Sequence, residues 1–221
     1  SKVSPALLDP DDVYGSVIRA CDESLRRLQT DYVDMYTLHS PENSEDWAEI
    51  LDAFLDLKED GKIKNFGVSY FDAEDLSEWL TLDGAEQTAV CENYFTLAYR
   101  KDETDLLPLC RKKGIPLISY PRLVMYEKVF QDSVLKRIAA DRGATPAQIA
   151  LAWLFSHAGV GAFVAPSSHA EISAYVDSLK ITLKPDEIQT LDARFPRPPK
   201  NVIRRERRAS LQQTPLPPLR V

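Results

Sequence analysis

The chain has 221 residues, of which 44% are hydrophobic and 28% charged, and its net charge is −7. This balance is typical of a globular protein with one sizeable core. The negative charge argues against a nucleic-acid partner, because phosphate binding needs a basic surface. No run of about 18 apolar residues occurs, so we expect no membrane span. The first residues do not resemble a signal peptide, and the three scattered cysteines predict reduced thiols in a cytoplasmic protein.

Helices and short apolar runs are predicted to alternate along the sequence. The first helix is expected over residues 11–28 and the first strand over 33–38, by the spacing of their apolar residues. Further strands are predicted at residues 63–69, 88–92, 115–119 and 160–164. Further helices are predicted at residues 45–60, 73–80, 103–113, 133–142, 145–157, 170–179 and 185–195. The helix at 145–157 has a hydroxyl cap, a proline in the first turn and a glutamine in the capping-box position.

Five predicted strands that alternate with helices indicate a parallel sheet with helical crossovers. The strands are continuously apolar, which is expected when both faces of a sheet are covered. An open doubly wound sheet and a β/α barrel both satisfy this pattern. No glycine-rich phosphate fingerprint follows a predicted strand, which weakens the open dinucleotide-binding sheet.

Four segments resemble motifs of the aldo-keto reductase family. Residues 23–41 (ESLRRLQTDYVDMYTLHSP) are similar to SLxxLxxDYxDLYxxHxP, and residues 61–69 (GKIKNFGVS) to GKIRxIGVSNF. Residues 115–120 (IPLISY) and 144–154 (ATPAQIALAWL) resemble GIxxxAYSPL and xTPAQVALAWLL. The matches keep their order and spacing over about residues 1–195. The resemblance implies a TIM-type (β/α)8 barrel of which this chain supplies about the last five β/α units.

The resemblance also divides the chain. Residues 1–195 would form a partial aldo-keto-reductase-like barrel, and residues 196–221 a basic, proline-rich C-terminal extension on the surface. Five strands cannot close an eight-stranded barrel, and the open sheet would expose two edges and a core face. We therefore expect either a missing N-terminal segment or an oligomer partner that completes the barrel.

The family reduces carbonyls with NADPH through a tetrad of Asp, Tyr, Lys and His. In that tetrad Tyr is the general acid, Lys (paired with Asp) lowers its pKa, and His orients the carbonyl. His39 matches the family His and follows a predicted strand, so it should lie on the catalytic rim; the alternative is a histidine that only ends a strand. Lys2 fits the family Lys, and the alternative is a solvated terminal lysine. The Asp and the Tyr have no candidate in this sequence.

The predicted nicotinamide end of the site matches the family unevenly. Ser69 matches the Ser of the VSNF motif, whereas Tyr70 and Glu92 replace an Asn and a Gln that bind the nicotinamide carboxamide. An ionised Glu92 accepts hydrogen bonds but cannot donate one. Its negative charge would also favour the oxidised, positively charged ring. Tyr120 fits the aromatic residue that stacks on the nicotinamide.

Three more residues complete the predicted cofactor-binding set. Leu123 lies in the loop after the strand at 115–119, and Ser167 and Ser168 follow the last strand, where the family binds phosphate at a helix start. No arginine for an adenosine 2′-phosphate occurs in the helix at 170–179. The resemblance therefore implies NADP(H) or NAD(H) without choosing between them.

The first functional hypothesis is NAD(P)H-dependent reduction of a small-molecule aldehyde or ketone to an alcohol. A second hypothesis is a non-catalytic, aldo-keto-reductase-like binding or scaffold protein, supported by the missing Asp and Tyr and by the replacements at Tyr70 and Glu92. A third is a diverged enzyme, such as a lyase, that keeps His39 on the same barrel.

Overall fold

A computed structural model of the chain describes residues 1–120 and 127–198. In these residues a parallel sheet has the strand order β1-β2-β3-β4-β5-β6, and each strand pairs with the next one along the sequence. The strands are β1 (Lys2–Val3), β2 (Val33–Leu38), β3 (Ile63–Ser69), β4 (Val90–Asn93), β5 (Leu117–Ser119) and β6 (Val160–Ala162). The predicted α/β class with a parallel sheet is confirmed. The two-residue strand β1 adds to the five strands that periodicity predicted.

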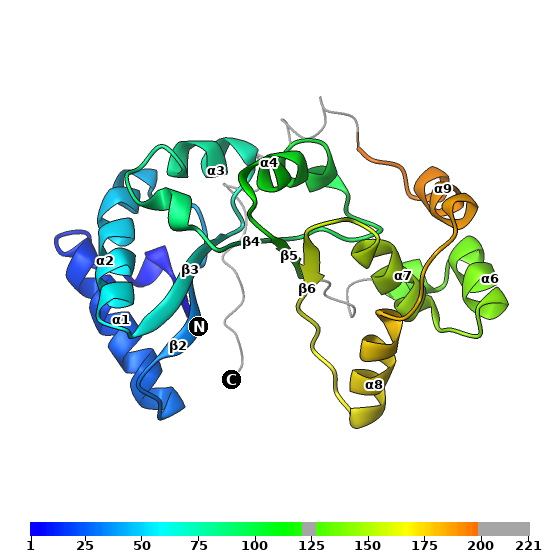
Figure 1. Cartoon of the computed structure of the whole chain (residues 1–221), viewed down its shortest axis with the longest axis horizontal. Coiled ribbons are helices and arrows are strands. Elements are labelled where there is room, and N and C mark those ends of the chain that lie inside the picture. Colours follow the sequence, from blue (N-terminus) through cyan, green and yellow to red (C-terminus); the bar gives the residue numbers. More distant parts are fainter. Residues whose placement is uncertain (121–126, 199–221) are drawn as a thin grey trace.

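Helices cover the outer side of this sheet, which curves as a band in Figure 1. They are α1 (Val13–Leu28), α2 (Trp47–Glu59), α3 (Ala73–Trp79), α4 (Leu106–Lys113), α5 (Glu127–Phe130), α6 (Ser133–Asp141), α7 (Pro146–Phe155), α8 (His169–Ser178) and α9 (Pro185–Arg194). Short 3-10 turns span Pro5–Leu7, Ser44–Asp46, Ala85–Gln87 and Lys101–Glu103. Among the described residues β1 and β6 form the two edges of the band. None of the helices in this part of the chain combines the length and apolarity needed to cross a bilayer.

Local sequence signals explain several helix ends. At the start of α7 the Thr145 side chain accepts a hydrogen bond from the Gln148 N–H, and the Gln148 side chain accepts one from the Thr145 N–H. This is the predicted capping box, with Pro146 at the first helical position. Gly114 ends α4 in the left-handed conformation at φ 72°, where glycine has no side chain to clash.

One predicted helix is divided in the structure. The expected helix at 103–113 is a 3-10 turn at Lys101–Glu103 followed by α4 from Leu106. The Asp105 carboxylate accepts a hydrogen bond from the Leu106 N–H at 2.8 Å and so starts a second helix. The prediction of one continuous helix was wrong because a side-chain cap interrupts it.

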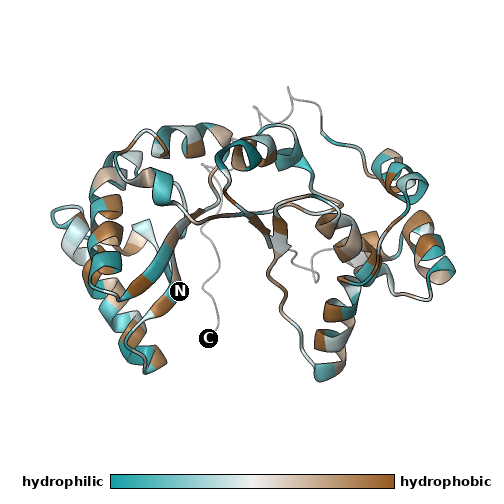
Figure 2. Ribbon diagram, viewed as in Figure 1, coloured by the Kyte–Doolittle hydropathy of each residue, from teal (hydrophilic) through white to brown (hydrophobic). Residues whose placement is uncertain are grey.

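The core lies between the sheet and its helices. On α2, Trp47, Ile50, Leu51 and Phe54 are buried on the predicted apolar face. Figure 2 shows helices banded in teal and brown, with brown segments along the strands. Gly67 permits a close approach of β3 and β4, because a Cβ there would lie 2.5 Å from the Val90 carbonyl oxygen.

The β6 end of the sheet is less well covered. Each of the three residues of β6 is only partly buried. Large apolar side chains here are exposed: Phe163 (48%), Val164 (36%), Ile172 (47%), Val176 (52%) and Leu179 (64%). Most of the predicted extension at 196–221, and the predicted site residue Leu123, lie outside the described residues.

Candidate active site

The sheet brings the predicted catalytic residues together at the carboxyl ends of its strands. His39 directly follows β2, Ser69 is the last residue of β3, and Ser69 lies in register with Glu92 on β4. Tyr120 directly follows β5, and Lys2 on β1 pairs with Thr37 near the end of β2. Since parallel strands end at the same edge, side chains that are far apart in sequence meet there.

Lys2 is at the centre of this cluster. Its Nζ donates a hydrogen bond to Ser69 Oγ at 3.0 Å and contacts both Glu92 Oε2 and the Tyr120 hydroxyl. The Lys2 side chain is 25% exposed, and burial lowers its pKa to about 7. The alternative of a solvated terminal lysine is wrong for this structure, because Lys2 reaches three side chains on three other strand ends.

Glu92 is the negative partner in the cluster. The residue is buried, and its Oε2 also accepts a hydrogen bond from Ser69 Oγ at 2.7 Å. The Tyr120 hydroxyl contacts the same oxygen. A buried carboxylate is costly unless it is paired and hydrogen-bonded. These contacts satisfy that requirement.

His39 is half-buried beside this cluster. Its backbone N–H donates to the Val3 carbonyl at 2.8 Å, which fixes its place next to β1. Burial lowers the pKa of the imidazole, and the positive charge of Lys2 lowers it further. His39 is therefore neutral near pH 7, with one ring N–H available to donate.

Aromatic rings surround the strand ends. The Tyr70 ring is nearly parallel to the Tyr120 ring, with centroids 6.0 Å apart, and meets His39 edge-on at 5.9 Å. Tyr70 has a left-handed backbone with φ 61°, a conformation that is uncommon for a bulky residue and that suits asparagine better. The stacking contacts help to hold this strained conformation in place.

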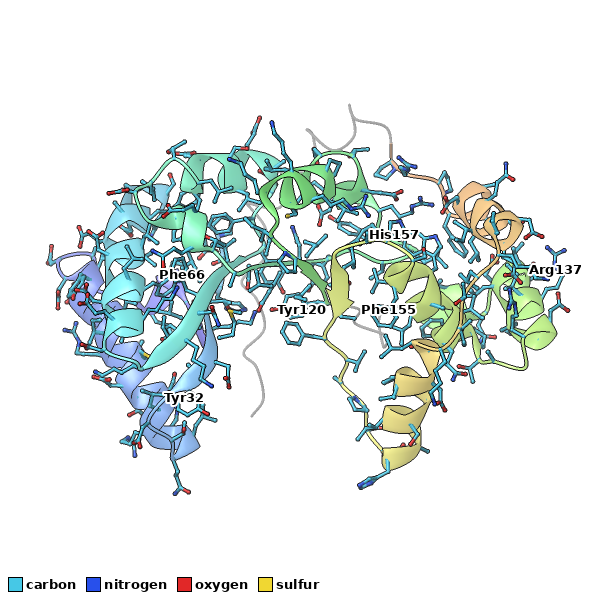
Figure 3. All side chains as sticks on the ribbon, in the orientation of Figure 1. Tyr32, Phe66, Tyr120, Arg137, Phe155 and His157 are labelled. Carbon is cyan, nitrogen blue, oxygen red and sulfur yellow. The ribbon has the colours of Figure 1, made fainter. Side chains whose placement is uncertain are left out.

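Tyr120 has two roughly parallel neighbours, Tyr70 and Phe163; the second ring centroid lies at 5.4 Å. Figure 3 shows Tyr120 near the end of β5 on the concave side of the sheet. Burial raises the pKa of its hydroxyl. The stacking of Tyr120 on a nicotinamide ring stays a prediction.

The predicted phosphate loop lies apart from this cluster. Ser168 caps α8 by accepting a hydrogen bond from the Glu171 N–H at 3.2 Å. The N–H and Oγ of Ser167 donate to Glu171 Oε2 at 2.6 and 3.0 Å. These donors already hold a carboxylate oxygen at a helix start, so their chemistry suits an anion.

Two aromatic residues of the site were missed by the sequence reasoning. Phe163 follows β6 and stacks on Tyr120, and Tyr94 follows β4 and packs edge-on against Tyr70 at 5.3 Å. Their signal was available, because each lies directly after a strand, where site residues gather. A hollow of ≈ 470 Å³ is lined in part by Lys2, Glu92 and Phe163, so the cluster borders open space.

A lysine, a neutral histidine and a buried carboxylate thus lie together at the carboxyl ends of parallel strands, where TIM-type barrels place their active sites. The sequence profile of the Aldo/keto reductase family matches residues 2–194. The chain belongs to this family, and its recognition from the four motifs is confirmed.

Individual relatives agree with this assignment. The chain is 35% identical over 185 residues to methylglyoxal reductase YeaE of Escherichia coli (strain K12), covering 82% of this chain and 65% of the relative. It is 34% identical to methylglyoxal reductase DkgB of Escherichia coli O157:H7, covering 80% of this chain and 62% of the relative. The chain therefore spans less than two thirds of the length of these two relatives.

Solved structures confirm the fold. An aldo-keto reductase from Klebsiella pneumoniae, solved in complex with NADPH, superposes with a TM-score of 0.84 at 35% identity. The match covers 90% of this chain and 70% of the other. The described sheet and helices are thus the corresponding part of a TIM-type aldo-keto reductase barrel.

Proposed function

We propose that the protein carrying this chain reduces small aldehydes or ketones to alcohols with NADPH or NADH. The observation that carries the proposal is that Lys2 and His39 lie near each other at the carboxyl end of the sheet, in a chain that belongs to the aldo-keto reductase family. The names of the relatives point to small dicarbonyls such as methylglyoxal and glyoxal as first substrates to test.

The residues of this chain bind and polarise the carbonyl. The neutral His39 donates a ring N–H to the carbonyl oxygen, and this hydrogen bond fixes the orientation of the substrate. The Lys2 ammonium, beside His39, stabilises the negative charge that develops on that oxygen.

Several residues of the structure fit a nicotinamide dinucleotide. When bound, the reduced nicotinamide would supply a hydride to the carbonyl carbon, and the alcohol is completed by a proton on the oxygen, which in the family a tyrosine gives and for which this sequence offers no candidate. Tyr120 offers a flat ring, and the Ser69–Glu92 pair offers polar contacts beside it. Ser167 and Ser168 lie at the start of α8, and the contact of the Ser167 N–H with the Glu171 carboxylate supports an anion site there. The three cysteines are buried and free in the structure, which supports a cytoplasmic location.

The test is turnover of methylglyoxal, with oxidation of NADPH or NADH followed by absorbance. Lys2→Met should lower kcat by about 10²–10⁴-fold, the range of positioned acid–base groups. Lys180→Met is the matched control, because Lys180 is 76% exposed on its side chain and lies outside the cluster. Binding of either cofactor without turnover of any aldehyde or ketone would refute the reductase and favour a binding protein.

A further inference from the structure

The position of Glu92 makes it unusual among the polar residues of the strand edge. It is the third residue of β4, in register with Ser69 on β3, and its side chain is only 3% exposed. A single carboxylate oxygen, Oε2, meets donors from three strand ends: Ser69, Lys2 and Tyr120. A carboxylate with three donors, one of them cationic, is stabilised in its ionised form.

Lys2 needs a counter-charge as much as Glu92 does. Burial lowers the pKa of Lys2 to about 7, which puts its ammonium close to losing the proton near neutral pH. An ionised carboxylate in contact acts in the opposite direction and favours the ammonium. The charge of Lys2 at neutral pH therefore depends on its partner.

The other titratable groups near Lys2 do not supply that counter-charge. His39 after β2 and the amino group of Ser1 on the same strand interact with Lys2 as like charges when protonated. The Tyr120 hydroxyl after β5 is neutral, because burial raises its pKa. Among the described residues, Glu92 on β4 is the carboxylate that forms an ion pair with Lys2.

We propose that Glu92 is a positioning residue that keeps Lys2 protonated and directed toward the substrate edge of the site. The notable feature is the residue type, because an amide at this place could not balance the lysine charge. For catalysis this inference rests on the proposed function, since the protonated Lys2 is the group that stabilises the carbonyl oxygen. For the charge of Lys2 it rests on the burial of Lys2 and its contact with Glu92, and does not need the proposed function.

The decisive experiment measures the pKa of Lys2 in the full-length protein. The pH dependence of Lys2 acetylation by acetic anhydride is followed by peptide mass spectrometry, without cofactor or substrate. Glu92→Gln keeps the size of the side chain and removes the charge. We expect the pKa of Lys2 to fall by about one unit or more, which is about a tenfold gain in the reactive neutral amine at a pH well below the pKa.

Two further variants keep the test decisive. Ser69→Ala removes a neutral partner of both residues and should shift the pKa of Lys2 much less than Glu92→Gln. Glu92→Asp keeps the negative charge but moves it farther from Lys2, because the side chain is shorter. This variant should give Lys2 an intermediate pKa, and it keeps the test valid if Glu92→Gln folds poorly. An unchanged pKa of Lys2 in the two Glu92 variants would overturn the inference.

Carbonyl reduction is scored separately, so the two proposals can fail independently. A shifted pKa in a protein that reduces no carbonyl would keep the Lys2–Glu92 pair and refute the reductase. Normal reduction with an unshifted pKa would refute the role of Glu92 alone.

Discussion

The two ends of the curved sheet differ in how well they are covered. Beside β3, Phe54 on α2 packs on Phe66, Ile50 lies in the same core, and all three are fully buried. Beside β6, Ile172 and Val176 on α8 remain about half exposed, and no residue of β6 is fully buried. The hydropathy colours show apolar segments at both ends, so composition alone does not separate them (Figure 2).

The proposed chemistry follows the same division. Ser69 and Glu92, which surround Lys2, lie on the well-covered strands, where packing fixes their positions. Ser167 and Ser168 lie on an exposed loop beyond β6. The proposed reacting end of the site is therefore held by the core, whereas the proposed anion-binding end depends on local capping at α8.

The largest expected effect on stability comes from replacing an isoleucine by alanine at each end of the sheet. Ile50→Ala should lower the free energy of unfolding by about 2–5 kcal/mol, because it leaves a cavity in a closed core. Ile172→Ala, at a side chain 47% exposed, should cost less than about 1 kcal/mol. Urea unfolding of both variants measures the difference. An equal cost at the two positions would show that α8 is covered in the whole protein and would remove the contrast.

A second comparison uses two glycines on strands. Gly67→Ala should destabilise by about 1–3 kcal/mol, because the new methyl would press on the backbone of Val90 and force β3 and β4 apart. At Gly161 on β6 the new methyl meets only the end of the Ile118 side chain, at 2.8 Å, which can move aside. Thermal unfolding should therefore separate the two variants clearly. A cost at Gly161 as large as that at Gly67 would argue against a loosely packed β6.

A third prediction concerns a buried carboxyl group in the 3-10 turn Lys101–Glu103. Asp102 is 3% exposed, its Oδ2 has no hydrogen-bond partner among the described residues, and burial raises its pKa to about 8. The folded state thus holds a proton that the unfolded chain releases above about pH 4. This contribution to stability is complete below that pH and is lost as the pH rises toward 8.

Asp102→Asn removes the titration. Relative to the parent, the variant should gain about 3 kcal/mol between pH 5 and pH 7.5, as urea unfolding at the two pH values would measure. Asp105→Asn is a control on the same segment that removes a carboxylate with a helix-capping role instead. Parallel stability profiles of the parent and Asp102→Asn would mean that Asp102 is not held neutral.

The sequence predicted the strands β2 to β6 and the place of His39 because both depend on local patterns, whereas the barrel order came from the family resemblance. Strand-length apolar runs and four motifs located β2 to β6, and His39 lies directly after one of those runs. The strand β1, with two residues, is too short for any periodicity to reveal. The pairing of Lys2 with Glu92 was also missed, since it joins positions 90 residues apart through sheet register.

The predicted phosphate loop also contains a contact that the local sequence pattern could not predict. Ser167 and Ser168 were predicted as anion donors from their place before a helix; in the structure Ser167 donates to a carboxylate, whereas the Ser168 hydroxyl accepts the capping hydrogen bond from the Glu171 N–H. Their partner, Glu171, follows the cap residue by three positions, a spacing typical of a helix start. Only the three-dimensional arrangement shows that its carboxylate engages the Ser167 amide and hydroxyl.

The smallest expected effect tests that engagement. Glu171→Gln removes a negative charge and weakens the hold on the Ser167 donors, so NADPH should bind about 3–10-fold more tightly, in line with a charge effect of about 1 kcal/mol at a helix start. Fluorescence titration measures the two affinities. Asp177→Asn, on the same helix but paired with Lys180, controls for the change in net charge. If both variants bind NADPH equally well, Glu171 does not compete for the anion site, and the loop at the exposed end of the sheet is open to phosphate without rearrangement.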